Sequence, residues 1–108
     1  MRPPYGSIDR RVEQVLMDMG YKIFIWNLDT NDWRYGKTNS GKILRNVQIE
    51  LKSLKFLTHS YIVLQHDNTM ETIQLQQKMI SFIKSKNFNI TSLNECINDI
   101  DSPYVSNF

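Results

Sequence analysis

The sequence predicts an α/β fold with a parallel sheet, in which three β-strands alternate with three α-helices. Short apolar runs, typical of buried strands, alternate with longer segments of helical periodicity. Each connection between successive strands is long enough for a right-handed crossover. A parallel sheet needs cover on both faces, and three strands are few for such a sheet. We therefore expect part of a barrel or of a doubly wound sheet.

The first helix is expected over residues 8–19, with Ser7 as its N-cap and Gly20 just after its end. Its apolar residues recur at helical spacing and should face the sheet. They are Ile8, Val12, Val15, Leu16 and Met19. The first strand is expected next, at residues 21–26, with the apolar run Ile23-Phe24-Ile25 at its centre.

The second helix is expected over residues 41–54, after a polar connection at 34–39, with Ser40 or Asn39 as its N-cap. Its apolar stripe consists of Ile43, Val47, Leu51 and Leu54. The second strand is expected at residues 60–64.

The third helix is expected over residues 70–85, with Thr69 as its N-cap. The side chains that it should bury are Ile73, Met79, Ile80 and Ile83. A last short strand is expected at residues 88–93, and the polar residues 94–108 show no firm pattern.

The size and composition indicate one small folded domain, which we place at residues 1–97 with a tail at 98–108. The apolar share is 41%, enough for a core. The net charge is only +2 with both signs interspersed, which argues against a nucleic-acid partner. No apolar run approaches the roughly 18 residues of a membrane span, and the first residues lack the apolar segment of a signal peptide.

Polar side chains follow two of the expected strands, at the points where these strands end. Asp29, Asp32 and Trp33 come after the first strand, and His66 comes after the second. Strand ends are where α/β folds place their chemistry. A histidine can donate or accept a proton near neutral pH, and a neighbouring carboxylate stabilises its charged form. The sequence thus predicts an acid–base pair of Asp32 and His66; a histidine that only caps its strand is the alternative.

Other candidate residues allow two interpretations each. Trp33 offers a flat apolar face for a sugar ring or an acyl pocket, or it is a core residue, as we expect for Trp26. Arg2 can orient a carboxylate through its planar fork, or it is a solvated charge near a chain end. His59 is expected in a surface loop. Metal binding by this chain alone is not expected, because no two histidines stand at a ligand spacing on one element.

Three short motifs occur in a fixed order: Arg2-Pro3-Pro4-Tyr5-Gly6, Asp29-Thr30-Asn31-Asp32-Trp33 and Leu64-Gln65-His66. They resemble the third, fourth and fifth motifs of the polysaccharide deacetylases of carbohydrate esterase family 4, the NodB homology domain. The residues in and around these motifs are most similar to those of fungal chitin deacetylases. The resemblance runs from Arg2 to about Ile97, and three ordered motifs are far more specific than one.

The resemblance implies a distorted, incomplete (β/α) barrel. It also implies hydrolysis of N-acetyl groups on chitin or another N-acetylated glycan, assisted by a divalent metal, with zinc the first expectation. His66 would protonate the leaving amine, and Asp32 would tune it. Trp33 and Leu64 would line the pocket for the acetyl methyl group.

Arg2 would hold the base aspartate of the family, and the backbone N–H of Tyr5 would help to bind the oxyanion. The family's first two motifs, T-F-D-D-G and H-[ST]-x-x-H, supply the base and the metal ligands, and neither occurs in this chain. The chain therefore resembles the C-terminal half of a deacetylase module, and we expect it to be inactive by itself.

Three hypotheses remain open. The first is a truncated product of a secreted or wall-associated chitin deacetylase, in which Asn89-Ile90-Thr91 fits a glycosylation acceptor and Cys96 has an upstream cysteine as a conceivable partner. The second is a remnant that binds chitin through Trp33 and Tyr5 without hydrolysing it. The third is one half of a split enzyme, active only with a partner chain that carries the metal ligands.

Overall fold

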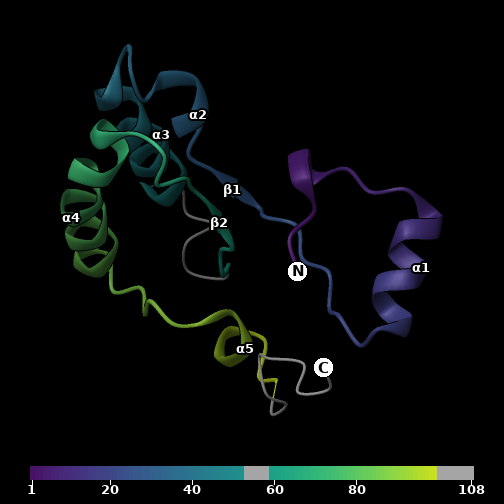
Figure 1. Ribbon diagram of the computed structural model, residues 1–108. Coiled ribbons are helices and arrows are strands. Elements are labelled where there is room, and N and C mark those ends of the chain that lie inside the picture. The colour runs from purple at the N-terminus through teal and green to yellow at the C-terminus, as the bar shows by residue number, and fades with distance from the viewer. Residues whose placement is uncertain (53–58, 100–108) are drawn as a thin grey trace. The chain divides into compact units, whose positions relative to one another are not determined.

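A computed structural model describes residues 1–52 and 59–99 of the chain (Figure 1). Its elements are η1 (Pro4–Gly6), α1 (Arg10–Asp18), β1 (Leu28–Asp29), α2 (Asp32–Tyr35), α3 (Ser40–Lys52), β2 (Val63–Leu64), α4 (Met70–Ser85) and α5 (Leu93–Cys96). The described residues form two compact units, Met1–Trp26 with residues 91–99, and Asn27–Ile90. The predicted helix end at Leu54 and nearly all of the tail at 98–108 lie outside the described residues.

The Asn27–Ile90 unit is built on a parallel sheet of two strands, β1 and β2. Leu28 pairs with Val63, and Asp29 pairs with Leu64. Successive side chains of a strand point to opposite faces, so this register places Leu28 and Val63 on one face and Asp29 and Leu64 on the other. Leu28 and Val63 pack in the core. The polar residues Asp32 and His66 follow the ends of β1 and β2 along the chain.

The side chain of Asn27 extends the short ladder by one step. Its Oδ1 accepts a hydrogen bond from the backbone N–H of Ile62 at 2.6 Å, and its Nδ2 donates to the carbonyl of Ser60 at 3.0 Å. A side-chain amide carries the same donor and acceptor as a peptide group. Asn27 therefore pairs with the segment before β2 in the way that another strand residue would.

The core of this unit lies between the sheet and the helices α3 and α4, which pack side by side (Figure 1). Its buried members are Leu28, Ile43, Val47, Leu51 and Met79. Half-buried side chains surround them, among them Tyr35, Leu75, Phe82 and Phe88. The predicted stripe of the second helix is confirmed for Ile43, Val47 and Leu51.

Helix α4 has the predicted bounds, and Thr69 caps it by accepting a hydrogen bond from the N–H of Thr72. The predicted buried face is only partly right. Met79 is buried and Ile83 packs on the core, but Ile73 and Ile80 are exposed. The residues that face the core are Thr72, Leu75, Met79, Phe82 and Ile83. Because α4 carries apolar residues on more than one side, their spacing alone did not select the buried face.

Two of the three predicted strands are wrong in place or kind. Residues 21–26 form no strand, because the N–H of Phe24 donates to the carbonyl of Met1 and the ladder with β2 begins only at Asn27. Residues 88–93 form no strand either, since helix α5 begins at Leu93. The second predicted strand is confirmed only in its last two residues, as β2. The fold is thus mixed α/β with two described strands.

The Met1–Trp26 part holds α1, which begins after Asp9 and not after the predicted cap Ser7. The Asp9 carboxylate accepts from the N–H groups of Arg11 and Val12 at 2.8 and 3.0 Å. Gly20 ends the helix at a positive φ of 82°, as expected. The predicted apolar face of α1 is not buried, because the helix buries none of its residues, and Val12 is 47% exposed.

The turn η1 packs closely on Trp26. Gly6 has a φ of 66°, and a Cβ atom there would lie 2.9 Å from the indole Cη2 of Trp26. The Arg2 guanidinium lies over the same indole, 5.9 Å from its centre. Trp26 thus holds the turn of the first motif in place.

Helix α5 was not predicted, although its start carries a recognisable signal. Ser92 and Glu95 form a capping box, in which each side chain bonds to the backbone of the other. The hydrogen bonds from Thr91 and Ser92 lower the pKa of the exposed Glu95 carboxyl.

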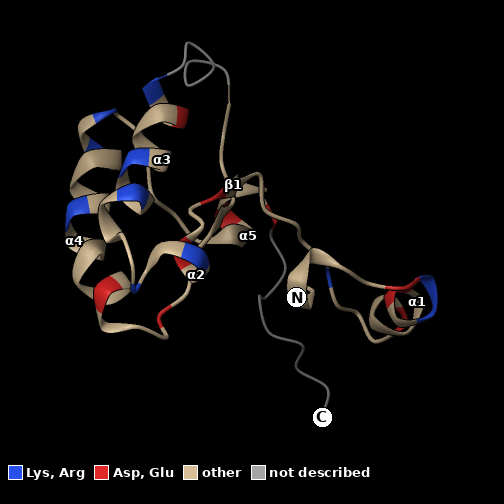
Figure 2. Cartoon of the chain, turned by 90° about the horizontal axis from the view of Figure 1, so that it is seen from above, with Lys and Arg blue, Asp and Glu red and all other residues tan. Residues whose placement is uncertain are grey.

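The helices α1, α3 and α4 each carry charges of both signs (Figure 2). In the described part of the chain, no helix is long and apolar enough to span a membrane.

Candidate functional site

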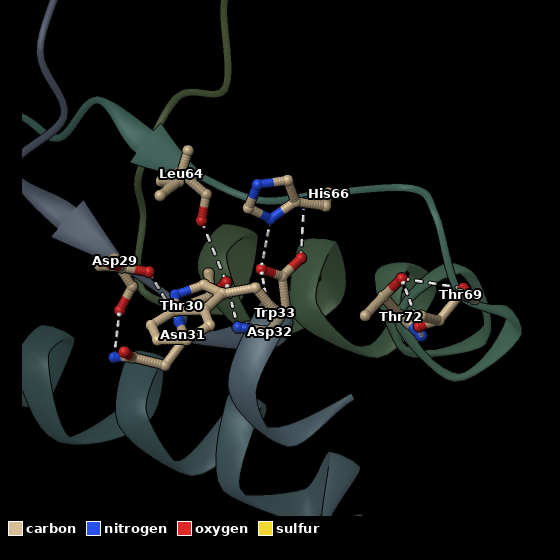
Figure 3. A network of polar contacts seen from close by, with 9 residues as sticks. All are labelled: Asp29, Thr30, Asn31, Asp32, Trp33, Leu64, His66, Thr69 and Thr72. Carbon is tan, nitrogen blue, oxygen red and sulfur yellow. Dashed lines mark hydrogen bonds and ion pairs between the residues drawn. The ribbon is translucent and has the colours of Figure 1, made fainter. Parts of the chain in front are cut away.

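The site is centred on Asp32 and His66, which follow the two paired strands (Figure 3). The Nδ1 atom of His66 lies 2.8 Å from Oδ1 of Asp32. A carboxylate only accepts hydrogen bonds, so Nδ1 carries the proton and donates it. The other ring nitrogen, Nε2, lies on the far side of the ring (Figure 3). It is therefore the atom that can give a proton to a bound molecule or take one from it.

Asp32 is 1% exposed, and its carboxylate is held by more than the imidazole. Oδ2 accepts from the backbone N–H of His66 at 2.5 Å, and Oδ1 also accepts from the N–H of Trp33 at 2.8 Å. A buried carboxylate needs such donors, because it has lost its hydration. Since Asp32 binds both the backbone and the ring of His66, it sets the position and the orientation of the imidazole together.

The loop between β1 and α2 turns Asp32 towards the end of β2. The Asp29 carboxylate accepts from the N–H of Asn31 at 2.8 Å, which makes an Asx-turn. Asn31 then adopts a left-handed conformation with a φ of 55°, which asparagine tolerates better than most residues. The helix α2 begins at the next residue, Asp32, within what was predicted as a loop end and polar connection.

The C-terminal end of α2 packs closely against the start of α4. A Cβ atom on Gly36 would lie 2.8 Å from the Asp32 carbonyl, 3.1 Å from Oγ1 of Thr69 and 3.2 Å from Cγ2 of Thr72. Only glycine fits such a close approach. The segment from His66 to Thr72 therefore contacts both ends of α2. His66 binds Asp32 at the start of the helix, and Thr69 and Thr72 lie against Gly36 at its end.

Two further predicted site residues belong to this unit. Trp33 is 62% exposed and follows Asp32 directly, so its indole is open to a ligand and is not a core residue. Leu64 is buried at 8% exposure and lies two residues before His66 (Figure 3). His59 is exposed, as predicted.

Arg2 and Tyr5 belong to the Met1–Trp26 unit. Tyr5 has a left-handed backbone, with φ 56° and ψ 13°, and its side chain is 99% exposed. Its N–H forms no hydrogen bond with any of the described residues. Non-glycine residues adopt this conformation at some cost, and such strain often occurs at functional sites. The Arg2 guanidinium lies over the Trp26 ring.

The described residues do not make a metal centre by themselves. Within residues 1–52 and 59–99, no group of three histidine, cysteine or acidic side chains is arranged to hold an ion. What the pair of Asp32 and His66 itself offers is proton transfer and hydrogen bonding.

Comparison with known proteins shows which molecules the chain is similar to. Chitin deacetylase 1 of Saccharomyces cerevisiae is 30% identical to the chain over 100 residues, 93% of the chain. The chitin deacetylase of Colletotrichum lindemuthianum is 35% identical over 92% of it, and a peptidoglycan-N-acetylglucosamine deacetylase of Listeria monocytogenes is 30% identical over 88%. These relatives are polysaccharide deacetylases.

A solved structure of a chitin deacetylase is also similar to the chain. The chitin deacetylase structure from Colletotrichum lindemuthianum matches 95% of the chain with a TM-score of 0.81 and 34% sequence identity. No family model matches the chain. The chain spans 32% of the length of the Saccharomyces protein and 40% of the Colletotrichum protein. The chain is thus similar, in sequence and in fold, to a part of these polysaccharide deacetylases.

Sequence reasoning missed several residues that shape the site. Thr30 and Gly36 are buried within the loop and helix that carry Asp32. A threonine between two aspartates at a strand end and a glycine shortly after them are weak signals, because both residue types are common in loops. The turn carried a better signal, since the side chain of an aspartate often accepts a hydrogen bond from the N–H two residues further on, which makes an Asx-turn.

Proposed function

We propose that this chain carries the proton-donating part of a polysaccharide deacetylase site, which acts on chitin or another N-acetylated glycan. The observation that carries the proposal is the contact of Asp32 with His66, 2.8 Å between Oδ1 and Nδ1, at the ends of two paired parallel strands. The similarity to chitin and peptidoglycan deacetylases over about nine tenths of the chain supports the reaction class.

In this proposal the imidazolium of His66 donates a proton from Nε2 to the amine that leaves when the acetamide is cleaved. Asp32 holds the ring by Nδ1 and the backbone by the N–H of His66, so that Nε2 stays directed at the substrate. The exposed Trp33 offers apolar surface for the sugar ring. Leu64, 8% exposed and two residues before His66, is proposed as a wall of the pocket for the acetyl methyl group.

The N–H of Tyr5, unbonded among the described residues, is proposed as a donor to the oxyanion of the tetrahedral intermediate. Arg2 is proposed to orient a carboxylate of the complete site. As the resemblance of the three motifs implies, we also propose a divalent metal for the complete site, with zinc as our first choice. The described residues do not fit such an ion, so its ligands would have to come from elsewhere. The proton transfer from His66 and the hydrogen bonds of Asp32 and Tyr5 use only groups of this chain.

The test uses the protein from its natural source, whose intact mass is measured first, together with His66→Gln and Asp67→Asn variants made in the same full-length product. Acetate release from N-acetylglucosamine hexamers is the readout. We expect His66→Gln to lower the rate by about 10²–10⁴-fold, the range for loss of a general acid. The neighbouring carboxylate Asp67 is exposed, and its variant should keep the rate. Equal rates in all three proteins would overturn the proposal.

A chitin-binding role without hydrolysis is the alternative that the exposed Trp33 favours. Calorimetric titration of this chain with the N-acetylated hexamer, together with the acetate-release assay of the natural protein, separates the two. Binding that is lost in Trp33→Ala, with no acetate release by the natural protein, would support a binding module over an enzyme.

A further inference from the structure

Thr30 is a fully buried polar residue that has no part in the proposed proton transfer or substrate contacts. It stands between Asp29 and Asp32, directly after β1, and its exposed fraction is 0%. Burying a hydroxyl is costly unless it is hydrogen-bonded. The partners of this hydroxyl therefore indicate what it does.

The Thr30 hydroxyl connects the end of β2 to the start of α2 (Figure 3). It donates to the carbonyl of Leu64 at 3.0 Å, and it accepts from the backbone N–H of Asp32 at 3.4 Å. The N–H of Thr30 donates to the same Leu64 carbonyl at 3.3 Å. A carbonyl oxygen has two lone pairs and can accept both bonds.

The two groups that Thr30 joins are those that place the acid–base pair. Asp32 supplies the carboxylate, and Leu64 lies two residues before His66 on the same extended segment. When the hydroxyl donates its proton to the Leu64 carbonyl, a lone pair of the same oxygen faces the Asp32 N–H. One oxygen atom thus binds both the residue that carries the carboxylate and the strand that precedes His66.

We infer that Thr30 is a positioning residue, whose hydroxyl fixes the distance between the Asp32 carboxylate and the His66 ring. The inference deepens the proposed function, on which it rests for its use in catalysis. The geometric part can be tested without any turnover. A valine has nearly the shape of threonine and lacks only the hydroxyl, which isolates the bond from the packing.

The experiment records the Nδ1–H proton of His66 by NMR in this chain labelled with ¹⁵N, assigned by its loss in His66→Gln. Thr30→Val should remove the signal or raise its exchange with water by about tenfold, as expected for the loss of one hydrogen bond. Thr30→Ser retains the hydroxyl and should restore the signal. Thr72→Val is the matched control, because Thr72 is 1% exposed and its hydroxyl donates to the Thr69 carbonyl, away from the pair.

A merely structural role would make Thr30→Val and Thr72→Val behave alike at His66, and that result would overturn the inference. If Thr30→Val does not fold, hydrogen exchange in the unmodified chain tests the inference instead. The N–H of Asp32 should then exchange at least about tenfold more slowly than that of the exposed Lys37, and equal exchange would overturn the inference. A lost His66 signal in Thr30→Val, in a protein whose natural form releases no acetate, would support the positioning role while refuting the proposed function.

Discussion

The Nδ1 atom of His66 lies 2.8 Å from Oδ1 of Asp32, although 34 positions separate the two residues in the sequence. The parallel register of β1 and β2 brings them to the same edge of the sheet. The same carboxylate also accepts from the N–H groups of Trp33 and His66. One buried side chain thus links a strand end, a helix start and the imidazole.

The first prediction concerns this carboxylate. In Asp32→Asn, an amide NH₂ replaces one acceptor oxygen and faces donors, so at least one buried bond is lost. We expect the free energy of unfolding to fall by about 2 kcal/mol, measured by urea denaturation. Asp67→Asn changes an exposed carboxylate nearby and should shift it by less than about 0.5 kcal/mol. Equal losses in the two variants would contradict the importance of the Asp32 bonds.

The second prediction concerns the close approach at Gly36. A methyl group there would meet the Asp32 carbonyl at 2.8 Å, and Gly36→Ala should therefore destabilise the fold by about 1–3 kcal/mol. Gly41→Ala is the matched control, because its Cβ would meet Asn39 at an ordinary 3.6 Å within α3. There we expect no loss, or a gain of up to about 1 kcal/mol. Thermal unfolding of both variants distinguishes these outcomes.

The third prediction concerns Asn27, whose amide pairs with the backbone of Ser60 and Ile62. Asn27→Ala should cost about 1–2 kcal/mol of stability and speed hydrogen exchange at the Ile62 amide. Asn27→Asp retains an acceptor for Ile62 but turns a second acceptor oxygen towards the Ser60 carbonyl, so we expect it to destabilise the fold at least as much as alanine. A harmless alanine variant would show that the ladder does not depend on this side chain.

The fourth prediction concerns pH and the capping box of α5. The hydrogen bonds from Thr91 and Ser92 lower the pKa of Glu95, so its contribution to stability is present above the unfolded value of about 4.3 and is lost as pH falls through the folded pKa. Residues Leu93–Cys96 should therefore lose helical amide signals at acid pH. Glu95→Gln keeps a capping group that does not titrate, and its α5 should be insensitive over the same range.

Local signals in the sequence predicted the elements whose causes are local. Thr69 caps α4 because a short hydroxyl side chain precedes a long helical segment, and Ile43, Val47 and Leu51 repeat at helical spacing on α3. The contact of Asp32 with His66 was also predicted, although the strand that precedes Asp32 is β1 and not the apolar run at 23–25.

The predictions that failed depend on partners distant in sequence. The apolar run Ile23-Phe24-Ile25 has every local property of a strand, but the N–H of Phe24 is taken by the Met1 carbonyl. The cap of α1 is an exception with a local cause, because the Asp9 carboxylate accepts from the N–H groups of Arg11 and Val12. Thr30 and Gly36 were overlooked, since their importance lies in what surrounds them and not in their residue types.

The register of Leu28 with Val63 and Asp29 with Leu64 has a consequence for how this chain tolerates changes of length. Consecutive residues of an extended segment alternate between faces, about 3.3 Å apart along the strand. One residue inserted between Leu64 and His66, or between Asp29 and Asp32, would turn a functional side chain to the wrong side or move it out of reach. We therefore expect these two short intervals to keep their number of residues.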